Sequence, residues 1–199
     1  MNKIITISRE FGSGGRELGR RLAEKLQFAY YDKEIIEEIA QRTSLAESYI
    51  ENVMDHQPMI AYPVRMGVSL QTLNLIQMPS QQIYQTQYEI IKEAAERSDC
   101  IIVGRCADYI LREMSPLRVF VYSDLPSKIK RCTERKKEHE TFTEKELKKN
   151  IEKINKGRSQ YYSFYTNQHW GAPSNYDLCV NTTHLSIEKA ADAIVRFFL

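Results

Sequence analysis

The sequence predicts an α/β fold, a parallel sheet flanked by helices in three layers. Short apolar runs bounded by polar residues recur along the chain, and longer stretches with helical spacing separate them. Strands that alternate with helices are joined by right-handed crossovers, so we expect a parallel sheet with both faces covered. In such folds ligands bind at the carboxyl ends of the strands.

The individual elements follow from spacing and from capping residues. The runs expected to be strands are Ile4–Ile7, Cys100–Val103, Val119–Tyr122 and Leu178–Val180, with Phe28–Tyr31 as a further short strand. The expected helices are Arg16–Leu26, Lys33–Gln41, Ser80–Arg97, Ala107–Glu113, Pro126–His139, Glu144–Phe164 and Ile187–Phe197. Thr143 and Ser186 are suitable N-caps for the last two helices.

Residues 43–79 break this alternation, because they carry Pro58, Pro63 and Pro79 and show only weak periodicity. We expect a small helical lobe inserted over the sheet. The alternative is an ordinary long connection with one or two helices. With 199 residues, 42% of them hydrophobic, the chain can bury one sizeable core, so residues 1–199 are expected to form a single domain.

The composition limits which partners and which cellular compartment we expect for the protein. The 28 basic and 26 acidic residues leave a net charge of only +2, so nothing demands a nucleic acid or an acidic membrane as partner. The four cysteines form no C-x-x-C pair or zinc-like cluster, and we expect reduced, mostly buried thiols. No leader and no apolar run of the roughly 18 to 20 residues that span a bilayer is visible. We therefore expect a cytoplasmic protein, and its oligomeric state stays open.

A glycine cluster follows the first expected strand. Residues 12–15 read Gly-Ser-Gly-Gly, and Arg16 opens the next expected helix. Glycines let the backbone turn several N–H groups onto one anion, and the helix adds the positive end of its dipole. The stretch predicts a phosphate-binding loop; the alternative is a tight turn with no phosphate role.

The loop departs from the usual P-loop rule, which asks for Gly, four residues, and then Gly-Lys-Ser/Thr. Arg9 stands where the first glycine belongs and Gly14 fits the second. Gly15 replaces the lysine and Arg16 replaces the hydroxyl residue. The ammonium and the magnesium-binding hydroxyl are therefore both missing.

Two further strand ends carry polar residues. Gly104 and Arg105 follow one strand, and Asp108 comes three residues later. Arg105 is suited to hold a phosphate or a base carbonyl through two parallel hydrogen bonds, or it pairs with Asp108 as a structural contact. Asp32 follows the short strand and is suited to hold a ribose hydroxyl, to orient a nucleophile, or to help retain magnesium through water. As an N-cap of the next helix Asp32 is equally well explained.

Arginines on the later helices are candidate cations. Arg131 and Arg135 stand one helical turn apart and share a face of the helix. A phosphoryl group in transfer needs cations placed in this way. The alternative is a basic helix face that is simply solvated. Arg158 precedes an aromatic stripe that includes Tyr161, Tyr165 and Trp170. For these rings we favour packing over a stacking platform for a base.

Four motifs occur in order along the chain: Ile-Ser-Arg-Glu-Phe-Gly-Ser-Gly-Gly-Arg-Glu (7–17), Tyr-Tyr-Asp-Lys-Glu-Ile-Ile (30–36), Ile-Val-Gly-Arg-Cys-Ala-Asp-Tyr-Ile-Leu (102–111) and Ser-Asn-Tyr-Asp-Leu-Cys-Val-Asn (174–181). Together they resemble the cytidylate kinase-like proteins, a branch of the P-loop nucleoside monophosphate kinases. The resemblance implies a P-loop kinase-like sheet, with 43–79 as the inserted acceptor-binding lobe. It also implies ATP-dependent phosphoryl transfer, with Mg²⁺, to a nucleoside monophosphate, CMP or dCMP first.

The resemblance also implies roles for single residues. Gly12, Ser13, Gly14, Gly15 and Arg16 would form the donor-phosphate loop. The acceptor would be held by Asp32, Arg105 and, with a shifted spacing, Asp108. Arg131, Arg135 and Arg158 match the lid arginines and, with Arg16, are the expected catalytic cations.

The departures from the orthodox enzymes keep other functions open. Val103 stands where the orthodox strand ends in aspartate, so magnesium has no obvious protein ligand and would be held by phosphates and water, with Arg16 or Arg9 supplying the missing charge. One alternative is a nucleotide-binding regulatory module that is catalytically weak or inactive. The other is a kinase of a non-nucleotide small molecule.

Overall fold

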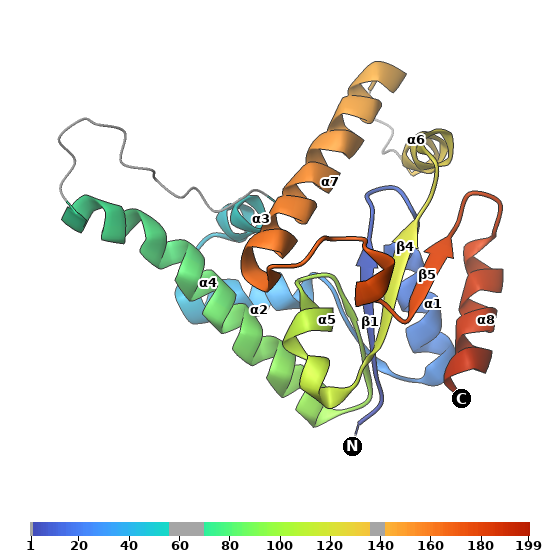
Figure 1. Cartoon of the computed structure of the whole chain (residues 1–199), viewed down its shortest axis with the longest axis horizontal. Coiled ribbons are helices and arrows are strands. Elements are labelled where there is room, and N and C mark those ends of the chain that lie inside the picture. The colour runs from blue at the N-terminus through green and yellow to red at the C-terminus, as the bar shows by residue number, and fades with distance from the viewer. Residues whose placement is uncertain (1, 56–69, 136–141) are drawn as a thin grey trace.

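The computed structural model describes residues 2–55, 70–135 and 142–199, and of these the side chains of residues 55 and 70–79 are left out (Figure 1). Five strands form one sheet in the order β2-β3-β1-β4-β5, and every neighbouring pair is parallel. The strands are β1 (Ile4–Arg9), β2 (Ala29–Tyr31), β3 (Cys100–Val103), β4 (Leu117–Tyr122) and β5 (Leu178–Asn181). The predicted parallel α/β sheet is thus confirmed, including the short strand β2.

Helices cover both faces of the sheet, which makes three layers (Figure 1). The helices are α1 (Gly15–Leu26), α2 (Glu34–Thr43), α3 (Glu47–Asp55), α4 (Leu70–Arg97), α5 (Ala107–Ile110), α6 (Leu125–Glu134), α7 (Glu144–Thr166) and α8 (Ile187–Phe198). Two short 3-10 turns cover Arg112–Met114 and Pro173–Asn175. Helices α1 and α8 pack side by side on one face, and α2, α4 and α5 lie on the other.

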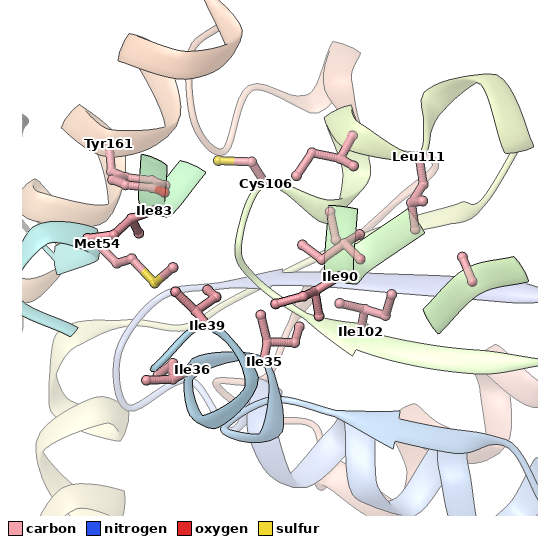
Figure 2. Close-up of a cluster of buried hydrophobic side chains, with 14 of the residues drawn as sticks. Ile35, Ile36, Ile39, Met54, Ile83, Ile90, Ile102, Cys106, Leu111 and Tyr161 are labelled. Atoms are coloured by element: carbon pink, nitrogen blue, oxygen red, sulfur yellow. The ribbon is translucent and has the colours of Figure 1, made fainter. Parts of the chain in front are cut away.

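The alternation of side chains along the central strands builds two cores. In β1, Ile5 and Ile7 point into the cluster under α1 and α8, whereas Ile4 points to the opposite side. The opposite cluster is shown in Figure 2, where Ile35 and Ile39 of α2 meet Ile102 of β3. Because β3 is buried on both faces, it reads as an unbroken apolar run. β1 is buried on both faces as well, and there the buried Thr6 and Ser8 interrupt the isoleucines.

Three helices have a boundary that differs from expectation by three residues or more. Helix α4 begins ten residues before the predicted Ser80, so Pro79 lies inside it. Helix α5 ends at Ile110, and its predicted last turn is a separate 3-10 helix, the tighter form common at helix ends. Helix α6 ends at Glu134, and the predicted extension to His139 falls mostly outside the described residues. The predicted N-caps are confirmed: Thr143 and Ser186 accept backbone hydrogen bonds.

The segment 43–79 contributes α3 and the start of α4, and residues 56–69 lie outside the described part of the chain. Ile50 and Met54 of α3 are buried in the same hydrophobic cluster as Ile35 and Ile39 of α2. An inserted acceptor-binding lobe here stays a prediction, as does the single-domain organisation. Of the four cysteines, all free, only Cys100 and Cys106 are buried, fewer than expected. No helix of the described residues has both the length and the apolar character to cross a membrane.

Candidate active site

The glycine loop between β1 and α1 is folded so tightly that two of its positions admit no side chain. Gly12 and Gly14 have φ values of +76° and +88°, in the left-handed region that favours glycine. A Cβ on Gly12 would lie 3.0 Å from Lys128 Cβ of α6, and one on Gly14 would lie 2.5 Å from Ile187 Cδ1 of α8. The loop is therefore pressed between two helices, with the N-terminus of α1 directly behind it.

The backbone of the loop is held from behind by polar side chains. Ser13 is fully buried; its hydroxyl donates to the Glu10 carbonyl at 2.8 Å, and its own carbonyl accepts from Thr182 Oγ1 at 2.7 Å. Arg131 donates to the Gly12 carbonyl at 3.3 Å. The Ser13 side chain is thus turned into the loop, whereas the N–H groups of the first turn of α1 lack intrahelical partners.

The two candidate arginines, Arg131 in α6 and Arg135 at its C-cap, take different positions. Arg131 also donates to Ser123 Oγ at 3.2 Å and to the Thr182 carbonyl, so its guanidinium ties the loop to β4 and β5. Arg135, at the end of the helix, forms an ion pair with Glu17 in the first turn of α1. Both side chains line the large cavity described next, and their role as lid cations stays a prediction.

A cavity of about 440 Å³ opens over the glycine loop. Gly12, Gly14 and Gly15 line it, and so do Phe142, directly before the N-cap of α7, and Leu147 in the first turns of that helix. Phe142 is about half exposed, which leaves an aromatic face available to a flat ring. The large cavity therefore combines a glycine loop with apolar side chains.

A second, smaller cavity of about 100 Å³ lies at the ends of β1 and β3. Gly104, Arg105 and Cys106 line it from below, and Glu51 of α3 lines it as well. Three arginines line both cavities: Arg9, Arg16 and Arg158. The two cavities therefore meet at a wall of positive charge.

Asp32 lies behind this wall and lines neither cavity itself. It is only 2% exposed, pairs with Arg16, and lies 3.7 Å from Arg9 Nη2 through its Oδ1 atom. The N-cap position of α2 is Lys33, without a side-chain hydrogen bond, so the N-cap explanation of Asp32 is wrong. The carboxylate is instead turned to the arginines because β2 ends beside the start of α1.

The residues after β3 adopt an unusual backbone. Gly104, Arg105 and Cys106 have φ values of +76°, +60° and +54°, a strained conformation for the two that carry side chains. The Arg105 carbonyl accepts from Gln87 Nε2 at 2.9 Å, and Tyr161 donates to Gln87 Oε1 at 3.2 Å. The conformation is thus held by α4 and α7, and it turns Arg105 toward the small cavity.

Arg105 and Asp108 do not pair in the described structure. Arg105 Nε and Asp108 Oδ1 are both buried without a hydrogen-bond partner there, and the Asp108 Oδ2 atom accepts from the Tyr162 hydroxyl at 2.7 Å. Burial raises the pKa of Asp108, and the Tyr162 hydrogen bond opposes that rise. Asp108 lines neither cavity, so its predicted substrate-binding role has no support from its position.

The aromatic stripe of α7 packs mostly against protein, in line with the interpretation favoured above. Tyr165 stacks on Tyr84 with ring centroids 3.9 Å apart, and Trp170 meets Phe120 edge-on at 5.3 Å. Tyr161 is 4% exposed. Tyr161 and Trp170 also reach the wall of the small cavity.

Arg9 and Arg158 form the centre of the cationic wall. Arg158 donates to the Arg9 carbonyl at 3.1 Å and lies over the Phe11 ring at 5.8 Å. The pKa of Arg9 is lowered well below its ordinary value, first by burial and then by Arg158 and Arg105. Neighbouring arginines therefore disfavour the charged form of Arg9, and a bound anion would favour it.

The chain fits a polyphosphate better than it fits a protein-bound magnesium. Within the described residues no three His, Cys, Asp or Glu side chains are grouped to hold a metal ion. The Glu10 carboxylate does line the large cavity, but it is engaged by Lys128 Nζ at 2.6 Å. A magnesium ion at this site would be held by phosphate oxygens and water, which is its common mode of binding beside nucleotides.

The fold is shared with known kinases. The shikimate kinase of Bacteroides thetaiotaomicron superposes with a TM-score of 0.58 at 14% identity, over 98% of this chain and 97% of that one. A structure of an uncharacterized protein from Eubacterium ventriosum superposes with a TM-score of 0.73 at 28% identity, over 99% and 98% of the two chains. The sheet, its helices and the glycine loop define the P-loop kinase fold.

The family is narrower than the fold. Residues 4–184 match the model of the cytidylate kinase-like family, and the chain belongs to that family. It is 26% identical to the cytidylate kinase of Staphylothermus marinus over 98% of this chain and 95% of that protein. The family and the fold are those of nucleotide and small-molecule kinases.

Two features of the site are not among the predicted site residues. Arg9 was expected only as a substitute charge, although its place in the first-glycine position of the loop was a signal for a larger role. Phe142 precedes the α7 N-cap in a stretch without a motif, and nothing in its local sequence indicates that it reaches the large cavity.

Proposed function

We propose that the protein transfers the terminal phosphoryl group of ATP, supplied with Mg²⁺, to a nucleoside monophosphate, with CMP and dCMP as the first candidates. The observation that carries the proposal is the meeting of a large and a small cavity at Arg9, Arg16 and Arg158. Phosphoryl transfer needs two substrates in line and cations where they meet, because charge spreads over the oxygens of the transferred group.

The large cavity suits the donor. Its glycine loop offers backbone N–H groups to the phosphates, and Phe142 and Phe11 offer aromatic surface in the same cavity. The small cavity suits the acceptor, because Arg105 at the end of β3 lines it. Asp32 lines neither cavity, so it would act on the acceptor through its ion pair with Arg16. The cytidylate kinase of Staphylothermus marinus and the family membership support a cytidine nucleotide as the acceptor.

The reaction needs no protein base. An acceptor phosphate is already ionised near neutral pH, so one of its oxygens forms the new P–O bond while the bond between the γ-phosphorus and the β,γ-bridging oxygen breaks. The electron pair of the broken bond stays with ADP. The residues of this chain would therefore act by positioning and by neutralising charge, with Arg16, Arg131, Arg135 and Arg158 as the expected cations.

The proposal is tested with purified protein, ATP–Mg²⁺ and a panel of nucleoside monophosphates. A diphosphate product, formed most efficiently from CMP or dCMP, is the expected result. Absence of product from every member of the panel would contradict the proposal.

Arg16→Ala is the matching test of the site. Arg16 lines both cavities and pairs with Asp32, so its loss should lower kcat by about 10²-fold or more and change the Kd of the acceptor much less. Arg21→Ala, on the outer surface of α1 and paired with Glu17, is the control and should leave both quantities unchanged. An equal effect of the two substitutions would argue against the site.

Specific observations favour each of two other functions. The P-loop lysine and hydroxyl are absent, which favours a nucleotide-binding regulatory module. Calorimetry would then show tight ATP binding independent of Mg²⁺ and no turnover. The small cavity of about 100 Å³ favours a small non-nucleotide acceptor. Extending the same panel to sugars and hydroxy acids would reveal such a product.

A further inference from the structure

Arg9 occupies a position that the P-loop rule reserves for glycine. It is the last residue of β1, and its side chain is 11% exposed. It nevertheless lines both cavities, so its guanidinium lies at the wall that the donor and acceptor sites share. A buried arginine at this point calls for an explanation, because burying its charge is costly without a partner.

The space for Arg9 is made by Gly15. A Cβ on Gly15 would lie 2.5 Å from Arg9 Cβ and 3.0 Å from Arg9 Cγ. Position 15 is the place of the lysine in the P-loop rule. A lysine there would collide with the stem of Arg9, so the two departures from the rule are one coupled exchange: the glycine and the cation have traded places.

Gly104 accommodates the other end of the side chain. A Cβ on Gly104 would overlap with Arg9 Nη1 and would lie 2.8 Å from Arg9 Cζ. The guanidinium is thus seated on the backbone of Gly104, at the end of β3, beside Arg105. Glycines on both sides of Arg9 hold its head group at one place.

Arg9 lies among other arginines. Asp32 lies 3.7 Å away and also pairs with Arg16, while Arg105 and Arg158 add positive charge. Glu51 is the carboxylate among the residues that line the small cavity, whereas Asp32 is buried and lines neither cavity. Arg9, Arg16, Arg105 and Arg158 all line this cavity, and their forked N–H groups are suited to a phosphate group.

We propose that Arg9 replaces the P-loop lysine, with its guanidinium contacting the γ-phosphoryl group of the donor where the two cavities meet. The inference rests on the proposed phosphoryl transfer and assigns a catalytic residue to it. The cation reaches the transferred group from the strand that precedes the loop, instead of from the helix that follows it.

The test restores the orthodox loop in two steps. Arg9→Met keeps the volume of the stem and removes the charge, and it should lower kcat by about 10²- to 10³-fold. Arg9→Lys keeps a charge and should lose less. The double variant Arg9→Gly/Gly15→Lys puts the cation in the lysine position and removes the side chain that would collide with it. Its kcat should be at least about tenfold higher than that of Arg9→Met.

A binding measurement distinguishes direct contact of Arg9 with the γ-phosphate from a purely structural role of Arg9. The ratio of the Kd values for ADP and ATP reports on the γ-phosphate, and Arg9→Met should reduce that ratio about tenfold or more, the effect of one charge-assisted hydrogen bond. Arg42→Met, which breaks an ion pair with Glu93 away from both cavities, is the matched control and should leave kcat and the ratio unchanged.

Each outcome decides the inference. A folded Arg9→Met protein with kcat within about threefold of the wild type and an unchanged ratio would overturn it, as would a double variant with no recovery of kcat or of the ratio. Should the wild type form no product with any acceptor, the proposed function fails, and the ratio alone then decides whether Arg9 contacts the γ-phosphate. Should Arg9→Met not fold, Arg9→Lys and the double variant supply the same comparison.

Discussion

At the scale of single residues, Asp108 shows how burial sets a charge. The residue is 4% exposed, and one of its two carboxylate oxygens accepts from Tyr162 while the other is unpartnered in the described structure. Burial is the largest influence on its pKa and raises it above the ordinary 3.8. Asp108 therefore joins α5 to α7 as a structural group, at some cost in stability when it ionises.

Asp108→Asn should remove a pH dependence of stability. Below about pH 3.8 the carboxyl is protonated in both states; as the pH rises from there to the raised folded pKa, the unfolded chain releases the proton first, so stability falls. The Tm of the wild type minus that of the variant should accordingly fall over this window and then level off. Thermal unfolding at pH 3.5 to 7 measures it.

Asp124→Asn is the control with the opposite sign. The pKa of Asp124 is lowered by its hydrogen bonds from Ser127, so its contribution is present above about pH 3.8 and lost as the pH falls. The wild-type Tm minus the Asp124→Asn Tm should therefore rise with pH. A difference for Asp108→Asn that rises in the same way would show that its carboxyl is not destabilised by burial.

At the scale of elements, α7 is placed by its first turn. Thr143 accepts from the Glu146 N–H at 3.3 Å, and the Glu146 carboxylate accepts from the Thr143 N–H at 2.8 Å, which is a capping box. The helix then carries Arg158 to the cationic wall and Tyr161 to the support of Arg105. The same cap sets the position of Phe142, directly before it, on the large cavity.

Thr143→Ala should lower the free energy of unfolding by about 1 kcal/mol, the usual effect of losing an N-cap side chain. It should also weaken ATP binding, because the helix start that carries Phe142 and Leu147 loosens. Chemical denaturation and calorimetry measure the two effects. Thr133→Ala in α6 is the control, since Thr133 only bonds back to the Ile129 carbonyl and alanine favours helix; its stability should be unchanged or slightly higher.

At the scale of the whole molecule, the positive charge is local. The chain has a net charge of only +2, yet Arg9, Arg16, Arg105 and Arg158 gather at one edge of the sheet. The parallel arrangement brings this about, because every strand ends on that edge. Binding of anions should therefore be confined to this edge and should respond to salt there.

Inorganic tripolyphosphate should raise the Tm of the protein, because a ligand that binds only the folded state stabilises it, by about 2.7 kcal/mol at a hundredfold excess over its Kd. The gain should shrink between about 50 mM and 500 mM NaCl as the charges are screened. Differential scanning calorimetry measures it. Arg112→Met is the control: Arg112 is exposed and stacks on Tyr109, so its replacement should leave the gain in Tm unchanged. A gain in Tm that does not depend on salt would contradict a cationic site.

Much of the fold was predictable because its signals are local. The apolar runs of β1, β3 and β4 and the N-caps Thr143 and Ser186 depend on neighbours within a few residues. The early start of α4 was not predicted, because Pro79 indicates a break that the structure does not make. Interior prolines destabilise helices on average, and tertiary context overrides that tendency.

The candidate site divides in the same way. The glycine loop and the arginine after β3 were predicted from motifs within single segments, and the structure places both on the cavities. Asp108 was predicted to bind substrate, yet it lies in neither cavity lining, because spacing along the chain does not tell which way a short helix turns its side chains. The coupling of Arg9 to Gly15 and Gly104 involves three segments and is visible only in space.

The sequence by itself determined the alternation of strands and helices, the place of the glycine loop and the family, since periodicity, turn residues and motifs are properties of short segments. The tertiary structure alone decided which cations share a wall, that Asp32 pairs with arginines instead of capping α2, and that a buried Arg9 separates two cavities. The physical reason is that residues 9, 32, 105 and 158 meet only after the right-handed crossovers bring the strand ends to one edge.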